Sequence, residues 1–269
     1  MVAAGRSGSP GAAGSEPGGI RAGIGGWTFE PWRGTFYPEK LAKARELEYA
    51  ASRLTAIEVN GTFYSAQTPA TYARWRKAAP EGFLFALKAG RFCTQRKDLS
   101  QAGESVARFL GQGLTELEDR LGPILWQLPH TKAFDAAQIA AFLSLLPASQ
   151  DGVPLRHAIE PRHESFADPA FFDLARKAGV AVVYADSPKY PCFPEQTAAF
   201  TYARLQDAHE DIATGYGAAA LDGWADRARD WAEGGRDVFM FFINGAKVRA
   251  PAAAEALIER VGRPPVSAS

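Results

Sequence analysis

Hydrophobic and polar positions define two kinds of segment that alternate along this chain. Short apolar runs rich in β-branched and aromatic residues are separated by longer amphipathic stretches rich in Ala, Leu, Arg and Glu. Runs of the first kind predict buried strands, and stretches of the second kind predict helices. The expected strands are Arg21–Trp27, Ala56–Tyr64, Leu84–Gly90, Gly122–Pro129, Arg156–Arg162, Val180–Ser187, Phe200–Gln206 and Asp237–Asn244. The expected helices are Glu39–Leu54, Thr68–Ala79, Ala102–Arg120, Asp135–Leu146, Asp168–Ala178, Ala218–Glu233 and Ala252–Val261.

The regular alternation of strand and helix predicts a parallel sheet with right-handed crossovers. Eight such strands favour closure into a single (β/α)8 TIM barrel of the α/β class. The alternative is an open doubly wound sheet, which usually shows a glycine-rich phosphate-binding turn after its first strand. Residues 24–28 read Ile-Gly-Gly-Trp-Thr and do not match GxGxxG, so the barrel is the favoured fold.

The chain divides into an expected N-terminal tail and one domain. Residues 1–19 are mostly Gly, Ala, Ser and Pro, a composition that predicts a disordered tail. Residues 20–269 then form the TIM-barrel domain, with the roughly 250 residues usual for that fold. The tail lacks the apolar core of a signal peptide, and no stretch is long and apolar enough to span a membrane. We therefore expect a cytoplasmic protein with no membrane partner.

Composition narrows the range of partners. The 30 basic and 30 acidic residues give zero formal net charge, whereas duplex-binding proteins usually carry a basic excess. The two cysteines, Cys93 and Cys192, make no disulfide framework, and no CxxC or Cys/His spacing marks a structural zinc site. We therefore expect a small-molecule substrate rather than a nucleic acid, and we assign no cofactor. The sequence leaves the oligomeric state open.

Charged and amide residues gather at the expected carboxyl ends of the strands, where barrel enzymes place their active sites. Alternate residues of a strand face the lumen, so Ile57 and Val59 facing the helices would put Glu58 and Asn60 inside. The same reasoning gives the lumen-facing set Glu58, Asn60, Lys88, Gln127, Glu160, Arg162, Asp186, Arg204, Gln206 and Asn244. Three acids thus meet three bases, which indicates either a working site or a structural ion-pair network that closes the barrel.

The loops expected on the same face are rich in aromatic residues. They are Trp27, Trp32, Tyr37, Phe63, Tyr64, Phe92, Phe166 and Tyr190. Each alone is typical of packing, but together they favour an apolar-walled pocket with a few polar groups, as small-molecule sites usually have. His163 directly follows the strand-end residue Arg162 and joins the candidate binding residues.

Several of these motifs resemble the YecE-like proteins, the domain of unknown function 72 family. The motifs are residues 24–27 (Ile-Gly-Gly-Trp), 32–34 (Trp-Arg-Gly), 36–38 (Phe-Tyr-Pro), 58–64 (Glu-Val-Asn-Gly-Thr-Phe-Tyr), 85–88 (Phe-Ala-Leu-Lys), 127–129 (Gln-Leu-Pro), 159–163 (Ile-Glu-Pro-Arg-His) and 185–187 (Ala-Asp-Ser). The resemblance implies a TIM barrel and supplies no reaction. Where the family usually has an aromatic residue, a His-Gly pair and an Asn-Asp pair, this chain has Pro161, Gln206-Asp207 and Asn244-Gly245.

The leading functional hypothesis is an enzyme, a hydrolase or a lyase or isomerase, acting on a small anionic or polyhydroxylated substrate such as a sugar or phosphosugar. Carboxylates would supply acid and base catalysis, and Lys88 is also a candidate Schiff-base amine. The candidate catalytic residues are Glu160, Asp186, Glu58 and Lys88. The candidate substrate-binding residues are Trp27, Asn60, Tyr64, Gln127, Arg162, His163, Arg204 and Asn244.

Two alternatives remain open from sequence. The first is a metal-dependent phosphodiesterase of the endonuclease IV-like barrel type, in which Glu58, Glu160, Asp186 and His163 would bind a divalent ion. Such barrels use more histidines than this chain offers, and the zero net charge argues against a duplex substrate. The second is a ligand-binding barrel without catalysis, because a fold does not by itself imply a reaction.

Overall fold

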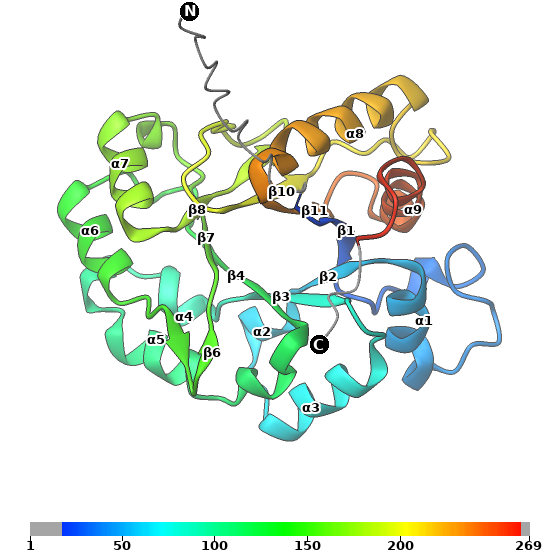
Figure 1. Ribbon diagram of the computed structural model, residues 1–269, viewed down its shortest axis with the longest axis horizontal. Coiled ribbons are helices and arrows are strands. Elements are labelled where there is room, and N and C mark those ends of the chain that lie inside the picture. The colour runs from blue at the N-terminus through cyan, green and yellow to red at the C-terminus, as the bar shows by residue number, and fades with distance from the viewer. Residues whose placement is uncertain (1–17, 265–269) are drawn as a thin grey trace, which may run out of the picture.

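The computed structural model describes residues 18–264 and shows a nearly closed barrel of parallel strands surrounded by helices (Figure 1). The strands are β1 (Ile20–Gly25), β2 (Ala56–Val59), β3 (Leu84–Lys88), β4 (Leu121–Gln127), β5 (Ser149–Gln150), β6 (Val153–Pro154), β7 (His157–Glu160), β8 (Ala181–Val182), β9 (Tyr184–Asp186), β10 (Phe200–Leu205) and β11 (Asp237–Phe242). The helices are α1 (Glu46–Arg53), α2 (Gly61–Tyr64), α3 (Pro69–Ala78), α4 (Arg91–Thr94), α5 (Gly103–Leu110), α6 (Ala136–Ser144), α7 (Pro169–Ala178), α8 (Ala218–Ala232) and α9 (Ala250–Val261). The expected tail lies almost wholly outside the described residues.

Nine strands form the barrel sheet, in the order β8-β7-β4-β3-β2-β1-β11-β10-β9. The two end strands, β8 and β9, are consecutive pieces of one segment, so that segment contacts β7 on one side and β10 on the other. Between them, the Val183 amide donates a hydrogen bond to the Ile159 carbonyl at 2.9 Å. The nine strands therefore occupy the eight expected barrel positions, and the predicted fold is confirmed.

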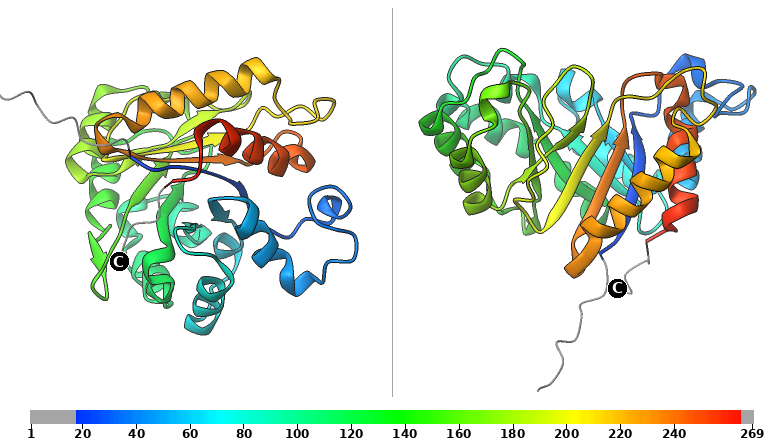
Figure 2. Two further views of the ribbon diagram at one scale, coloured as in Figure 1. Left: turned by 45° about the vertical axis from the view of Figure 1, so that its right-hand side comes forward. Right: turned by 90° about the horizontal axis from the view of Figure 1, so that it is seen from above.

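The core has two layers separated by the sheet. Alternate strand residues such as Ile57 and Trp126 pack outward against the helices, which cover the outside of the sheet in the further views (Figure 2). The inner layer fills the lumen with residues such as Leu84, Leu125 and Phe241. Because side chains alternate between the layers, polar residues two positions after an inner apolar residue also enter the lumen. The lower lumen is thus apolar and its carboxyl-terminal end is polar.

Some expected element boundaries are wrong. β2 ends at Val59, and after Asn60 the residues Gly61–Tyr64 form the single-turn helix α2 rather than more strand. The Thr62 hydroxyl holds this turn to the sheet through the carbonyls of Val59, at 2.9 Å, and Lys88, at 2.7 Å. The aromatic residues of α2 look like strand residues in sequence, but the turn carries them over the end of the barrel.

The helix expected over residues 102–120 is two helices. It consists of α5 and a 3-10 helix, Leu114–Arg120. Gly113 separates them because its backbone φ of +93° lies in the left-handed region that favours glycine. In addition, α1 begins at Glu46 rather than at Glu39, and the short hairpin of β5 and β6 was not expected. No helix within residues 18–264 is long and apolar enough to cross a membrane.

We expect Gly113→Ala to destabilise the fold by at least about 1 kcal/mol, because alanine is strained at positive φ. The new methyl group would also lie 2.6 Å from Pro69 Cγ, at the start of α3. The matched control is Gly223→Ala, inside α8, where a Cβ meets no atom within 4 Å. That change should stabilise by about 0.5–1 kcal/mol through helix propensity. Urea unfolding of both variants measures the difference, and equal effects would contradict the assignment of Gly113 as a backbone constraint.

Candidate functional site

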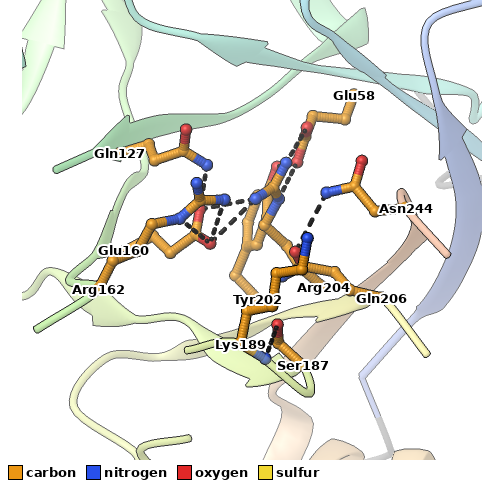
Figure 3. Close-up of polar contacts among 10 residues, drawn as sticks. All are labelled: Glu58, Gln127, Glu160, Arg162, Ser187, Lys189, Tyr202, Arg204, Gln206 and Asn244. Carbon is orange, nitrogen blue, oxygen red and sulfur yellow. Dashed lines mark hydrogen bonds and ion pairs between the residues drawn. The ribbon is translucent and has the colours of Figure 1, made fainter. Parts of the chain in front are cut away.

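Arg204 lies in the polar end of the lumen, between two fully buried glutamates (Figure 3). Its Nε and Nη2 atoms each donate to Glu58, on β2, at 3.0 Å. Its Nη1 atom donates to both carboxylate oxygens of Glu160, on β7, at 2.7 and 3.0 Å. One guanidinium on β10 therefore joins three strands across the lumen. The predicted entry of these three residues into the lumen is confirmed.

Other side chains complete the shell of hydrogen bonds around the two glutamates. The Tyr202 hydroxyl donates to Glu58 Oε2 at 2.8 Å. Gln127 Nε2 donates to Glu160 Oε2 at 2.7 Å, and Arg162 Nε and Nη2 donate to Glu160 Oε1 at 3.2 and 3.1 Å. We call these six residues the Arg204 network: Glu58, Gln127, Glu160, Arg162, Tyr202 and Arg204.

The network holds Glu160 in its ionised form. Burial alone would raise the pKa of this carboxyl, but the positive charges of Arg204 and Arg162 outweigh burial and lower it below its usual range. A carboxylate with a lowered pKa and a full set of donors is a poor proton donor at neutral pH. This geometry weakens the expectation that Glu160 acts as a catalytic acid.

Lys88 ends β3 beside the network and has no counter-ion of its own. Its side chain enters the lumen, and the residue is only 8% exposed. No residue in 18–264 accepts a hydrogen bond from Nζ or pairs with it within 4 Å, and Nζ lies over the Phe63 ring, 4.3 Å from its centroid. Burial, followed by repulsion from Arg204, lowers the pKa of Lys88 to about 8, although Glu58 and Glu160 oppose the shift. Lys88 therefore titrates close to neutral pH.

Arg162 is the most exposed member of the network. Its side chain is 15% exposed, and its guanidinium carbon lies 4.1 Å from the centroid of the Tyr190 ring. Nε and Nη2 bind Glu160, but Nη1 makes no hydrogen bond within the described part of the chain. We call the face of the barrel that carries Lys88 and Arg162 the mouth.

Amide side chains border the mouth. Asn244 Nδ2 donates to Gln206 Oε1 at 3.2 Å, and Gln206 Nε2 is buried without a hydrogen-bond partner in residues 18–264. Asn60 Nδ2 lies 3.5 Å from the Glu58 carbonyl oxygen. Lys189, an exposed residue of the loop after β9, lies beside the network and donates its backbone amide to Ser187 Oγ at 3.2 Å (Figure 3). These groups offer donors and acceptors around the charged centre.

The expected aromatic residues divide between the mouth and the core. Trp27 packs edge-on against Trp75, with ring centroids 5.2 Å apart, rather than against the network. Tyr64 is 67% exposed, and it lines, with Phe63 and Phe92, a groove of about 160 Å³ beside the mouth. Phe63 borders both this groove and Lys88. The mouth therefore has an apolar wall on one side.

The expectation that Asp186 faces the lumen is wrong. In the β9–β10 register, Ala185 lies opposite Arg204 and Asp186 lies opposite Leu205, which belongs to the outer core. Asp186 therefore takes the outward side of the strand, where its carboxylate lies 3.5 Å from the Tyr216 hydroxyl. Burial and then the charge of Asp207 raise its pKa. Alternation runs unbroken through this part of the chain, with Ala181 and Val183 in the inner layer and Val182 and Tyr184 in the outer one, so the expectation placed Asp186 on the wrong face.

His163 does not join the network either. Its Nδ1 atom accepts a hydrogen bond from the Ser165 amide at 3.2 Å and caps the 3-10 helix Glu164–Phe166. With Asp186 also elsewhere, the four ligands of the metal hypothesis do not converge. Among residues 18–264, no group of three or more His, Cys, Asp or Glu side chains could hold a metal ion.

Sequence reasoning missed Tyr202, which donates to Glu58 from inside the lumen. Its alternation with Arg204 on the same strand was a usable signal, because residues two apart share a face. Lys189 was missed as well, and no sequence pattern marks its loop.

The chain belongs to the DUF72 family, described as proteins of unknown function, whose model matches residues 21–268. The resemblance noted from the motifs is thereby confirmed. The protein is 27% identical over 160 residues to the UPF0759 protein YunF of Bacillus subtilis (strain 168). That match covers 57% of this chain and 54% of YunF, so it spans about half of the curated relative.

Solved structures agree on the fold. A DUF72 family protein (TM1631) from Thermotoga maritima MSB8 superposes with a TM-score of 0.73 at 22% identity, covering 89% of this chain and 98% of that one. A barrel outside the family, SacUVDE, superposes with a TM-score of 0.55 at 9% identity, covering 91% and 99%. At these identities the similarities establish the shared barrel architecture and no shared reaction.

We expect Arg204→Met to destabilise the protein by about 3–5 kcal/mol, because it leaves two buried carboxylates without their counter-charge. Adding Glu58→Gln and Glu160→Gln should recover much of the loss, since neutral amides need no cation. The control is Arg176→Met, which breaks an exposed pair with Asp173 and should change stability by less than about 1 kcal/mol. Chemical denaturation tests all three proteins, and a small effect of Arg204→Met would show that the network is not a stabilising centre.

Lys88→Met should stabilise the protein at pH 7, because it removes a buried amine that has no counter-ion. The folded-state pKa of about 8 lies below the ordinary lysine value of 10.5. The penalty for burying the amine is therefore complete below pH 8, and it fades as the pH rises towards 10.5. The unfolding midpoint of Lys88→Met should exceed that of the wild type at pH 7, and the difference should be smaller at pH 10. The exposed-residue control, Lys40→Met, should show no such trend, and a gain independent of pH would refute the shifted titration of Lys88.

Proposed function

We propose that the protein is an enzyme that binds a small anionic substrate at the mouth of the barrel. The observation that carries this proposal is the charge balance of the buried cluster. Three cations, Lys88, Arg162 and Arg204, face two carboxylates, Glu58 and Glu160. One positive charge is left over, and it lies on the solvent side because Arg204 is fully engaged within the lumen. An anion bound there would complete the balance.

The donors at the mouth suit a phosphate or carboxylate group. Arg162 keeps Nη1 free of partners among the described residues, and guanidinium groups bind such oxyanions with good geometry. Lys88, with a pKa of about 8, is mostly protonated at neutral pH and adds a second cation. The amides of Asn60, Gln206 and Asn244 would bind hydroxyl groups. A phosphosugar or a hydroxy acid combines these features.

Lys88 is better suited than Glu160 to transfer a proton in this site. A catalytic acid or base works best when its pKa is near the operating pH, which holds for Lys88 and not for the ionised Glu160. Glu58 and Glu160 then serve as positioning residues that hold Arg204 and shape the field around Lys88. Proton transfer beside an anionic group favours a lyase or isomerase over the glycosidase-like chemistry of two free carboxylates.

The metal-dependent alternative gains no support from the residues named for it, because Asp186 and His163 lie apart from Glu58 and Glu160. The similarity to SacUVDE extends to the fold alone. The non-catalytic alternative shares the proposed binding site and differs only in turnover. Binding must therefore be established first, and turnover second.

Titration with phosphate, a hexose phosphate and the parent hexose tests the proposal. We expect saturable thermal stabilisation of the wild type by the two anions and little by the neutral sugar, because a ligand of the native state raises stability. Arg162→Gln and Lys88→Met should each weaken binding of the hexose phosphate at least about tenfold, equivalent to about 1.4 kcal/mol. The control Arg176→Gln should bind as wild type does.

Equal stabilisation by the hexose and its phosphate would overturn the anion site. Unchanged phosphate binding in both mouth variants would place any anion elsewhere on the protein. Binding of the hexose phosphate without its conversion, followed by NMR of the ligand, would support the non-catalytic barrel.

A further inference from the structure

We infer that Lys88 is a covalent catalyst that forms an imine with an aldehyde or ketone carbon of the substrate. This inference rests on the proposed anion site at the same mouth and adds the class of substrate, an anion that carries a carbonyl group. It starts from the contrast between Lys88 and the other two cations of the lumen. Arg162 and Arg204 both bind carboxylates directly, whereas Lys88 Nζ lies against an aromatic ring.

A structural role explains Arg204 but not Lys88. A lysine that stabilised the barrel would be expected to bind a carboxylate, since burying an ammonium group without a partner is unfavourable. Both nearby carboxylates already accept hydrogen bonds from other side chains, three for Glu58 and five for Glu160. Methionine would fill the same space without a charge. The amine is thus left outside the ion pairs of the lumen, and its Nζ is available to a ligand.

The surroundings also make the amine nucleophilic. Only the neutral form attacks a carbonyl carbon, and both burial and an adjacent cation favour that form of a lysine. With a pKa of about 8, about a tenth of Lys88 is neutral at pH 7. An ordinary exposed lysine holds roughly 300-fold less neutral amine at the same pH. Arg204 supplies the adjacent cation here, as the second cause of the shift after burial.

The step is balanced without any further reactant. The Nζ lone pair forms a bond to the carbonyl carbon, and the electron pair of the C=O π bond moves to oxygen, which takes up the proton released by nitrogen. The resulting carbinolamine takes up one proton from solvent and loses water to give a protonated imine. This iminium keeps one positive charge near Glu58 and Glu160, as protonated Lys88 did. Its C=N bond withdraws electrons from the neighbouring carbon, so a proton there becomes acidic, and water later releases the product and the amine.

Arg162 fits the same scheme as the anchor for the anionic group of the substrate. Its free Nη1 atom and the Lys88 amine are both at the mouth. The charges of Arg162 and Lys88 each lower the pKa of Glu160, so the two cations lie near the same carboxylate. A substrate held by Arg162 would present a carbonyl to Lys88 rather than a second anionic group. Pyruvate, glyoxylate and the open-chain form of a hexose phosphate are simple probes with this pairing.

Borohydride trapping tests the inference on the full chain. The protein is incubated with each of the three carbonyl acids or phosphates, reduced with sodium borohydride and mapped by peptide mass spectrometry. We expect a stable adduct on Lys88 at a yield at least about tenfold above that on any other lysine, rising between pH 6 and pH 8 as the amine loses its proton. Excess inorganic phosphate should suppress it by occupying the anion site.

The internal control is Lys247, which also lies over aromatic rings, with Nζ 4.5 Å from the Phe29 centroid, but belongs to the loop after β11. Formaldehyde with a mild borane reductant methylates lysine amines without first binding at the anion site. Lys88 should be methylated faster than Lys247 and the exposed Lys40 at pH 7. Lys88→Arg is the decisive variant, because it should keep binding phosphate while it loses the trapped adduct.

Methylation of Lys88 no faster than Lys40, together with no Lys88 adduct from the three larger probes, would overturn the imine. If phosphate still stabilises the wild type in that case, the anion site survives and only the covalent role fails. If phosphate also fails to bind, the proposed function fails as well.

Discussion

The structure depends on one buried guanidinium. Arg204 binds Glu58 on one side of the lumen and Glu160 on the other, and all three side chains are almost wholly excluded from water. Removing Arg204 would leave both carboxylates without a counter-charge, and removing the carboxylates would leave Arg204 without one. In a medium of low dielectric constant, either change would lower stability by several kcal/mol. The strands β2, β7 and β10, which are far apart in the chain, are therefore held at fixed distances at the end of the lumen that opens to the mouth.

The same interaction separates structural residues from reactive ones. Sequence reasoning posed a choice between a structural ion-pair network and a catalytic cluster, and the geometry divides the residues between the two. Glu58, Glu160 and Arg204 bind one another through hydrogen-bonded ion pairs. Lys88 adjoins them without joining them, and the surplus positive charge therefore concentrates at the mouth. A rigid and fully hydrogen-bonded network is a suitable support for a group whose pKa must stay shifted.

Alternation of side chains explains both what could be predicted from sequence and what could not. The strand count and the alternation of side chains in β2, β4, β7 and β10 identify Glu58, Gln127, Glu160 and Arg204 as lumen residues. The same rule also explains why Asp186 is not a lumen residue: Ala181 and Val183 lie in the inner layer, so continued alternation turns Ala185 inward and Asp186 outward, and the expectation assigned the wrong face to this strand. Alternation also does not predict which charged side chains pair. Nothing in the sequence shows that Arg204 binds both glutamates while Lys88 binds neither. That choice depends on the tilt of the strands and the reach of each side chain.

Two of the departures from the pattern that the resemblance implies, Gln206 and Gly245, lie around the Arg204 network rather than within it. Gly245 adopts a φ of +73°, and a Cβ there would lie 2.6 Å from the Ala208 carbonyl oxygen, so the backbone at this point requires glycine. Gln206 accepts from Asn244 and keeps a buried amide nitrogen without a partner among residues 18–264. Both changes alter which groups border the mouth, while the hydrogen bonds of Arg204 involve neither residue. The residues that border the mouth can therefore differ from those of relatives while the charges of the Arg204 network and of Lys88 stay the same.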